Sequence, residues 1–223
     1  ASTPSYNPNK IIQKPNKEYW DTILENELYP LTYRCIKGLY APGSTFKMVV
    51  AIAGIVHGFI DTNTKHFCSG KIGLGDRLYH CWKNNGHGSM NVSDAIKESC
   101  DVFFYEISKK IGIDKIARVA EDFGLGKIYD IPLPNQKKGI IPSRDWKKKK
   151  YDESWYPGET LISAIGQGFV LTNPLQLAVM TSIIASNGKN VKPNIIKQNK
   201  DIEFEKLEKY QNAIKIIKSS MFK

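Results

Sequence analysis

The densest run of hydrophobic positions covers residues 44–58 and follows a sharp break at Ala41-Pro42-Gly43. On a helix, its apolar side chains cover almost the whole circumference, and Gly58 provides a C-terminal stop. A helix that is apolar on all sides is normally buried at the centre of a domain. The pattern therefore predicts a central helix over residues 44–58.

Three other stretches have a helical period. They are residues 91–110, capped by Asn91 or Ser93, residues 114–124, and residues 174–187, with Pro174 at the first helical position. Residues 59–90 are rich in glycine and predict short strands and turns. Clear strand alternation is scarce, so the chain is predicted to be predominantly helical.

The N-terminal end of the chain differs in composition from the rest. Residues 1–18 are rich in Pro, Asn and Lys and predict an extended N-terminal arm, which leaves residues 19–223 as the main domain. The first residues lack the basic and apolar regions of a signal peptide. No apolar run reaches the roughly 18 residues of a membrane span. We expect any anchor to lie outside this sequence.

The 223 residues carry a formal charge of +10, concentrated at Lys147-Lys148-Lys149-Lys150. A basic surface can attract nucleic acid or an anionic polymer, but no nucleic-acid-binding motif accompanies this run. We therefore interpret the four lysines as a solvated loop and expect no nucleic-acid partner.

Ser44 and Lys47 form a Ser-x-x-Lys pair at the start of the predicted central helix. This spacing puts both side chains on one face, where a neutral lysine can accept the proton of an attacking serine. The helix N-terminus favours a developing oxyanion. The same spacing begins at Ser186, at the C-terminal end of a predicted helix, and at Ser220, in what we expect to be a frayed terminus. The alternative is that Ser44 only caps the helix and Lys47 is a surface residue.

A second candidate element is Ser99-Cys100-Asp101, inside the predicted helix over residues 91–110. Ser99 could pass a proton between the nucleophile and a leaving amine, while the Asp101 carboxylate orients the lysine. The alternative interpretation is an ordinary polar face of a helix.

Three cysteines and a histidine form a candidate metal site within the Gly/Cys/His-rich segment 59–101: Cys68, Cys81, His87 and Cys100. Three thiolates and an imidazole match a closed tetrahedral zinc site. Asp76 and His80 are reserve ligands. The alternatives are a Cys68–Cys81 disulfide, or Cys100 as a small core residue.

Together these motifs resemble the transpeptidase domain of class B penicillin-binding proteins, and within them the elongation-specific penicillin-binding protein 2. The resemblance runs through nearly the whole chain. It rests on residues 2–9, Gly38-Leu39-Tyr40-Ala41-Pro42-Gly43-Ser44-Thr45-Phe46-Lys47, Trp82-Lys83, Gly86-His87-Gly88, Glu98-Ser99-Cys100-Asp101, Trp155-Tyr156-Pro157-Gly158, Gly166-Gln167-Gly168 and Thr172-Asn173-Pro174-Leu175-Gln176.

The resemblance implies an α+β fold of the penicillin-binding and β-lactamase type, with a helical lobe against an antiparallel sheet. It implies a peptidoglycan D,D-transpeptidase: Ser44 attacks the D-alanyl-D-alanine end of a stem peptide, and a neighbouring amine takes the acyl group. β-Lactams imitate the dipeptide and acylate Ser44. Lys47 is then the base, Ser99 the relay and Asp101 the polar residue that completes its motif.

The resemblance also implies residues and partners that spacing does not indicate. The cleft residues are expected to be Trp155, Tyr156, Gly166, Gln167 and Gly168. Members of this subfamily carry zinc near residues 59–101, and no organic cofactor is expected. The expected partners are peptidoglycan stem peptides, β-lactams and a wall glycosyltransferase. The expected location is the periplasm, as a domain anchored in the inner membrane.

One family motif is missing. The Lys-Ser/Thr-Gly strand, which binds the substrate carboxylate and lends an oxyanion-hole N–H, is absent, since Lys218-Ser219-Ser220 lacks the glycine and comes too early. The sequence is therefore expected to stop before this strand, and the isolated segment to be a poor enzyme. Two alternative functions stay open: a β-lactamase or β-lactam sensor, with Glu159 as a conceivable deacylating base, and a catalytically dead scaffold module.

Overall fold

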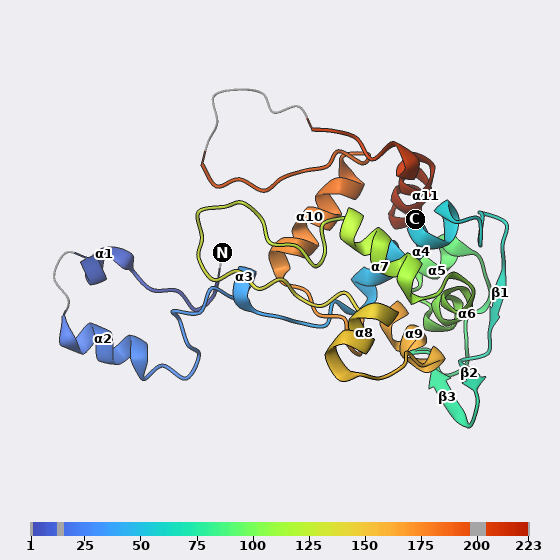
Figure 1. Cartoon of the computed structure of the whole chain (residues 1–223), viewed down its shortest axis with the longest axis horizontal. Helices are drawn as coiled ribbons and strands as arrows, with labels where there is room; N and C mark the ends of the chain where they lie inside the picture. Colours follow the sequence, from blue (N-terminus) through green and yellow to red (C-terminus); the bar gives the residue numbers. More distant parts are fainter. Residues whose placement is uncertain (1, 13–15, 197–203, 223) are drawn as a thin grey trace.

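The computed structural model describes residues 2–12, 16–196 and 204–222 as a helical body with short strands at one edge (Figure 1). Its helices are α1 (Pro8–Ile12), α2 (Lys17–Leu24), α3 (Arg34–Lys37), α4 (Lys47–Val56), α5 (Val92–Lys97), α6 (Asp101–Ile111), α7 (Ile113–Asp122), α8 (Arg144–Tyr151), α9 (Pro157–Ala164), α10 (Pro174–Ala185) and α11 (Gln211–Met221), with 3₁₀ helices η1 (Gly43–Phe46) and η2 (Glu208–Tyr210). Its strands are β1 (His66–Cys68), β2 (Lys71–Leu74), β3 (Arg77–His80) and β4 (Gly88–Met90).

Helix α4 lies in the middle of the body, in contact with α6, α7 and α11. Its residues from Val49 to Ala53 are fully buried, which confirms the predicted central helix. The α-helix begins three residues later than predicted, because the chain first makes the tighter turn η1. Gly43 enters this turn with a φ of +58°, a conformation that glycine adopts without a Cβ clash.

The helix predicted over residues 91–110 is wrong in one respect: it is two helices, α5 and α6, that meet at Ser99. Ser99 has a φ of +52°, in the left-handed region. Its N–H donates to the Ile96 carbonyl and the Cys100 N–H donates to the Ala95 carbonyl. These two bonds are the Schellman pattern that ends a helix, with serine where glycine is usual.

The strands form two short antiparallel pairs in the described part of the chain. β1 pairs with β4 and β2 pairs with β3. The mixed α/β class is therefore confirmed, although the sheets here are small and helices make most of the body (Figure 1).

The prediction of an extended N-terminal arm is only partly right, because the segment contains helical residues. It contains α1, and α2 already begins at Lys17, capped by the Asn16 side chain, which accepts a hydrogen bond from the Glu18 N–H. Figure 1 shows both helices projecting from one side of the body. The domain boundary near residue 18 stays a prediction.

The four-lysine run is a helix rather than the predicted solvated loop. Ser143 caps α8 by accepting a hydrogen bond from the Trp146 N–H. Lys147 is only 2% exposed. Its Nζ lies 2.5 Å from Glu159 Oε1 and 4.4 Å from the centre of the Tyr156 ring. The helical turn therefore directs one lysine of the run inward, to a partner twelve residues away in sequence.

The C-terminal part of the chain is ordered as α11, so the expected fraying at Ser220 is wrong. Ser220 is buried, and its hydroxyl donates to the Ile216 carbonyl. Lys218 Nζ donates to the Ala185 carbonyl and to Asn187 Oδ1. These residues belong to a helix that packs on α4 and α5.

Within the described residues, no helix is both long and apolar enough to cross a membrane.

Replacing Ile52 by Ala in α4 is expected to lower the free energy of unfolding by about 2–5 kcal/mol, because a fully buried side chain is lost. Urea denaturation followed by circular dichroism measures this change. Ile128, which is 61% exposed, provides the matched control, and Ile128→Ala should cost less than about 0.5 kcal/mol. Equal losses in the two variants would contradict the central position of α4.

Candidate active site

The two candidate catalytic motifs meet at one point, although they lie more than fifty residues apart in sequence. Ser44 is exposed on η1, and Lys47 is buried one turn later at the start of α4. Ser99 lies at the break between α5 and α6, and Asp101 is the first residue of α6. The structure therefore brings together all four residues that the sequence predicted as catalytic.

A continuous chain of hydrogen bonds connects these side chains. Ser99 Oγ lies 2.9 Å from Ser44 Oγ and 3.0 Å from Lys47 Nζ. Lys47 Nζ also donates to the Ser99 carbonyl at 2.9 Å and to Asp101 Oδ1 at 2.6 Å. Ser99 is thus the link between the exposed hydroxyl and the buried amine.

The direction of these hydrogen bonds can reverse, because a hydroxyl both donates and accepts. In one direction Ser99 donates to Ser44. In the other, Ser44 donates to Ser99, and Ser99 donates to the lone pair of a neutral Lys47. The amine then keeps two N–H groups for the Ser99 carbonyl and Asp101. The arrangement can therefore move a proton from Ser44 to Lys47 through one intermediate hydroxyl.

The turn that carries Ser44 packs directly against Gly166. The Gly43 N–H donates to the Gly166 carbonyl at 2.9 Å. A Cβ on Gly166 would overlap the carbonyl oxygen and the nitrogen of Gly43. Gly166 therefore supports the nucleophile turn from beneath, and its predicted role in the cleft stays a prediction.

The other predicted cleft residues make contacts elsewhere. Trp155 Nε1 donates to Thr160 Oγ1, and Tyr156 lies beside the buried Lys147. Gln167 and Gly168 are exposed in the turn after α9. A cleft role for Trp155, Tyr156, Gln167 and Gly168 stays a prediction.

Glu159 is bound into the α8–α9 contact. One of its carboxylate oxygens pairs with Lys147 Nζ, and the other accepts the Tyr156 N–H at 2.8 Å. A carboxylate with both oxygens occupied in this way is poorly placed to activate water.

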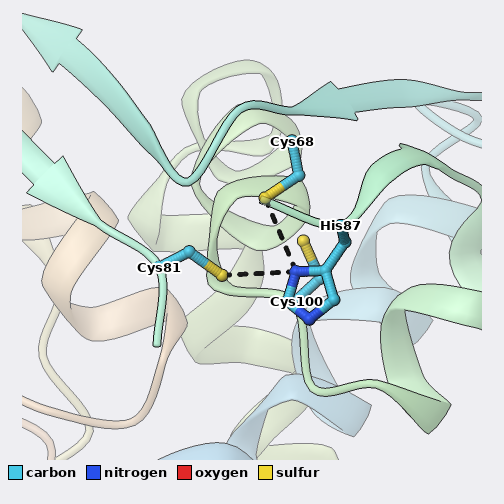
Figure 2. A group of neighbouring side chains, drawn as sticks. All are labelled: Cys68, Cys81, His87 and Cys100. Atoms are coloured by element: carbon cyan, nitrogen blue, oxygen red, sulfur yellow. Dashed lines mark hydrogen bonds between the residues drawn. The ribbon is translucent and has the colours of Figure 1, made fainter. Parts of the chain in front are cut away.

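The four candidate metal ligands converge on one centre (Figure 2). Cys68 comes from the end of β1, Cys81 follows β3, His87 precedes β4, and Cys100 precedes α6. Their ligand atoms all lie within 4.8 Å of one another. His87 Nδ1 is 3.5 Å from the sulfur of Cys68 and 3.5 Å from that of Cys81.

These spacings fit a tetrahedral cation site. Bonds of ~2.3 Å to sulfur and ~2.0 Å to nitrogen, at tetrahedral angles, put sulfur and nitrogen ~3.5 Å apart. Burial lowers the pKa of His87, which favours the neutral ring that binds metals. Burial raises the pKa of the Cys100 thiol, so a thiolate there requires a compensating cation.

The structure does not favour the alternative interpretations of these cysteines. The thiols of Cys68 and Cys81 are free rather than joined in a disulfide. The reserve ligands Asp76 and His80 are exposed on the β2–β3 hairpin, and neither joins the four converging side chains. The interpretation of Cys100 as a small core residue is half right, because the residue is fully buried but its sulfur faces the cluster.

Sequence reasoning assigned no role to one residue that contacts the site, Trp82. Its backbone N–H donates to Asp101 Oδ2 at 3.0 Å, and its indole N–H donates to the Ser99 carbonyl at 3.1 Å. The sequence signals were its position directly after Cys81 and its place in Trp82-Lys83, one of the segments that carry the family resemblance.

The whole chain, residues 1–223, matches the family described as the penicillin binding protein transpeptidase domain. The chain belongs to this family. Its relatives include the peptidoglycan D,D-transpeptidase MrdA of Acinetobacter baumannii, which is 36% identical over 199 residues, or 88% of this chain and 30% of that protein. This chain therefore spans less than a third of the length of that relative.

Solved structures of the same family superpose closely. PBP2 from Helicobacter pylori has a TM-score of 0.93 at 33% identity, over 100% of this chain and 42% of that chain, and its complex with MreC gives the same values. A chain of a peptidoglycan synthase complex that coordinates polymerization and crosslinking has a TM-score of 0.88 at 32% identity, over 99% of this chain and 39% of that one. The family resemblance seen in the sequence motifs is confirmed.

Gly166→Ala is expected to destabilise the domain by about 1–3 kcal/mol, because the added methyl group overlaps the Gly43 backbone. Hydrogen–deuterium exchange should become faster in the peptide that contains residues 43–47. Gly73→Ala is the matched control, since its nearest neighbouring atom would lie 4.0 Å away. If exchange at residues 43–47 is unchanged in Gly166→Ala, the packing of this turn on Gly166 is refuted.

Proposed function

We propose that the protein is a peptidoglycan D,D-transpeptidase that works through a Ser44 acyl-enzyme. The observation that carries the proposal is the hydrogen-bond chain from the exposed Ser44 hydroxyl through Ser99 to the buried Lys47 amine. The relative named a peptidoglycan D,D-transpeptidase supports the choice of reaction. The proposed chemistry needs no organic cofactor.

In the acylation step, Ser44 Oγ forms a bond to the carbonyl carbon of the penultimate D-alanine. The Ser44 proton passes to Ser99 as the Ser99 proton passes to a neutral Lys47. The bond from that carbon to the nitrogen of the terminal D-alanine then breaks, and the relay returns the proton to this nitrogen. The terminal D-alanine leaves, and the peptide remains as an ester on Ser44.

In the transfer step, an amine of a neighbouring stem peptide attacks the ester carbon. Its proton moves through the same relay, the bond to Ser44 breaks, and the Ser44 hydroxyl is restored. One amide is consumed and one is formed, so the crosslink requires no external energy source. The positive end of α4 supports the oxyanion in both steps.

In a form of the protein that carries the third motif, penicillin is expected to add one stable acyl group, because Ser44 opens the lactam ring and the ester hydrolyses slowly. Intact mass spectrometry measures the adduct. Ser44→Ala should abolish it, whereas Ser186→Ala, which removes the serine of another Ser-x-x-Lys sequence, should retain it.

Each other result selects a different function. Rapid turnover of a reporter cephalosporin without a lasting adduct would favour a β-lactamase. A stable adduct without transpeptidation of a stem-peptide substrate would favour a β-lactam sensor. A folded protein that never labels would leave the scaffold interpretation.

We further propose that Cys68, Cys81, His87 and Cys100 bind one zinc ion with a structural role. The support is the four-atom cluster and its ~3.5 Å sulfur–nitrogen spacing. Zinc would hold the ends of β1, β3 and the β4 loop against the start of α6. Cys100 lies between Ser99 and Asp101, so its sulfur would fix the backbone of the relay.

Purified protein is expected to contain one zinc per chain by elemental mass spectrometry, and Cys81→Ser should reduce this content to near zero, because a structural site requires all four ligands. Cys35→Ser is the matched control, since Cys35 lies outside the cluster, and it should keep the metal. Equal zinc content in both variants, or none in the unmodified protein, would rule out this site.

We also propose a location and partners for the whole protein. A domain that crosslinks peptidoglycan must face the wall, so we propose a periplasmic location. The inner-membrane anchor is proposed from the family resemblance. The H. pylori relative forms a complex with MreC, and another relative belongs to a synthase that joins polymerization to crosslinking. These support a glycosyltransferase partner, bound through regions beyond this sequence.

A further inference from the structure

We propose that Trp82 is a positioning residue for the catalytic relay: it holds Ser99 and Asp101 in place for Lys47. This inference rests on the proposed acyl-transfer function. Trp82 lies in the loop between β3 and β4, directly after the cluster residue Cys81.

Trp82 and Lys47 bind the same two groups. The Ser99 carbonyl accepts from Lys47 Nζ at 2.9 Å and from Trp82 Nε1 at 3.1 Å. The two oxygens of Asp101 are divided in the same way, with Oδ1 bonded to Lys47 at 2.6 Å and Oδ2 to the Trp82 N–H at 3.0 Å. Of the three acceptors around the buried amine, the Ser99 carbonyl and the Asp101 carboxylate are therefore also held by this tryptophan, and the third, Ser99 Oγ, is the relay hydroxyl itself.

The Ser99 turn needs this support because its backbone is in an unfavourable conformation. A left-handed φ costs a residue with a Cβ more than it costs glycine. The indole N–H also donates to the Glu98 carbonyl at 3.0 Å, so one donor binds two consecutive carbonyls at the end of α5. Unpaired helix-end carbonyls otherwise require water or a capping group.

Exposure and packing indicate a positioning role rather than a core role. Trp82 is 61% exposed, whereas tryptophan is highly buried on average, so core packing does not account for its position. Its ring meets the His87 ring edge to face, with centroids 5.2 Å apart. The side chain thus contacts both the Cys/His cluster and the relay, and it couples the position of His87 to the positions of Ser99 and Asp101.

The test compares Trp82→Phe with Trp20→Phe. Both variants remove one indole N–H, but Trp20 lies in α2, on the helices that project from one side of the body (Figure 1). Phe at position 82 keeps an aromatic ring against His87. In a form that carries the third motif, Trp82→Phe is expected to slow the acylation rate constant about tenfold, with an unchanged dissociation constant for the complex before acylation. Trp20→Phe should keep both values.

A second measurement does not depend on activity. Hydrogen–deuterium exchange at residues 98–101 should become faster in Trp82→Phe than in Trp20→Phe, because the Ser99 carbonyl loses a donor. Equal exchange in the two variants, or acylation of Trp82→Phe at the unmodified rate, would overturn the inference. If the unmodified protein does not acylate, the proposed function fails, and the exchange result alone decides the role of Trp82.

Discussion

The position of Lys47 Nζ sets the geometry of the site. A buried amine whose N–H groups lack partners is costly, about 1–3 kcal/mol for each unsatisfied group, so its acceptors must be held in place. Here those acceptors come from one short segment, Ser99 and Asp101, which faces the start of α4. α4 must therefore be central and rigid, and the chain must turn sharply at Ser99. A continuous helix through residue 99 would use the Ser99 carbonyl in its own backbone bonds and withdraw it from Lys47.

The sharp turn at Ser99 creates a second requirement. A serine in the left-handed region costs about 1–2 kcal/mol relative to the ordinary helical region, and the surrounding contacts must offset this cost. The Schellman bonds end α5, and Cys100, fully buried, anchors the next residue in the Cys/His cluster. Since residues 99, 100 and 101 are consecutive, the cluster and the relay share one backbone.

The sequence predicted those parts of the fold and site that local patterns determine. The apolar circumference of residues 44–58 identified α4, and the restricted chemistry of a serine nucleophile with a lysine base identified Ser44 and Lys47. The break at Ser99 could not be predicted, because apolar positions continue in helical phase from Ile96 to Phe103 and no glycine marks the stop. Lys147 was misplaced for a similar reason: four consecutive lysines indicate solvent, and only the fold brings Glu159 to one of them.

Gly166 and Trp82 illustrate a more general limit. Gly166 acts by having no side chain, and Trp82 acts through two N–H groups, so neither contributes a titratable group that spacing rules can detect. Their partners lie far away in sequence, at Gly43 and at Ser99. Motif analysis therefore finds the groups that transfer protons and misses those that fix the distances between them. In this domain those distances depend on a glycine contact beneath Ser44 and on a tryptophan opposite Lys47, and both depend on the folded chain as a whole.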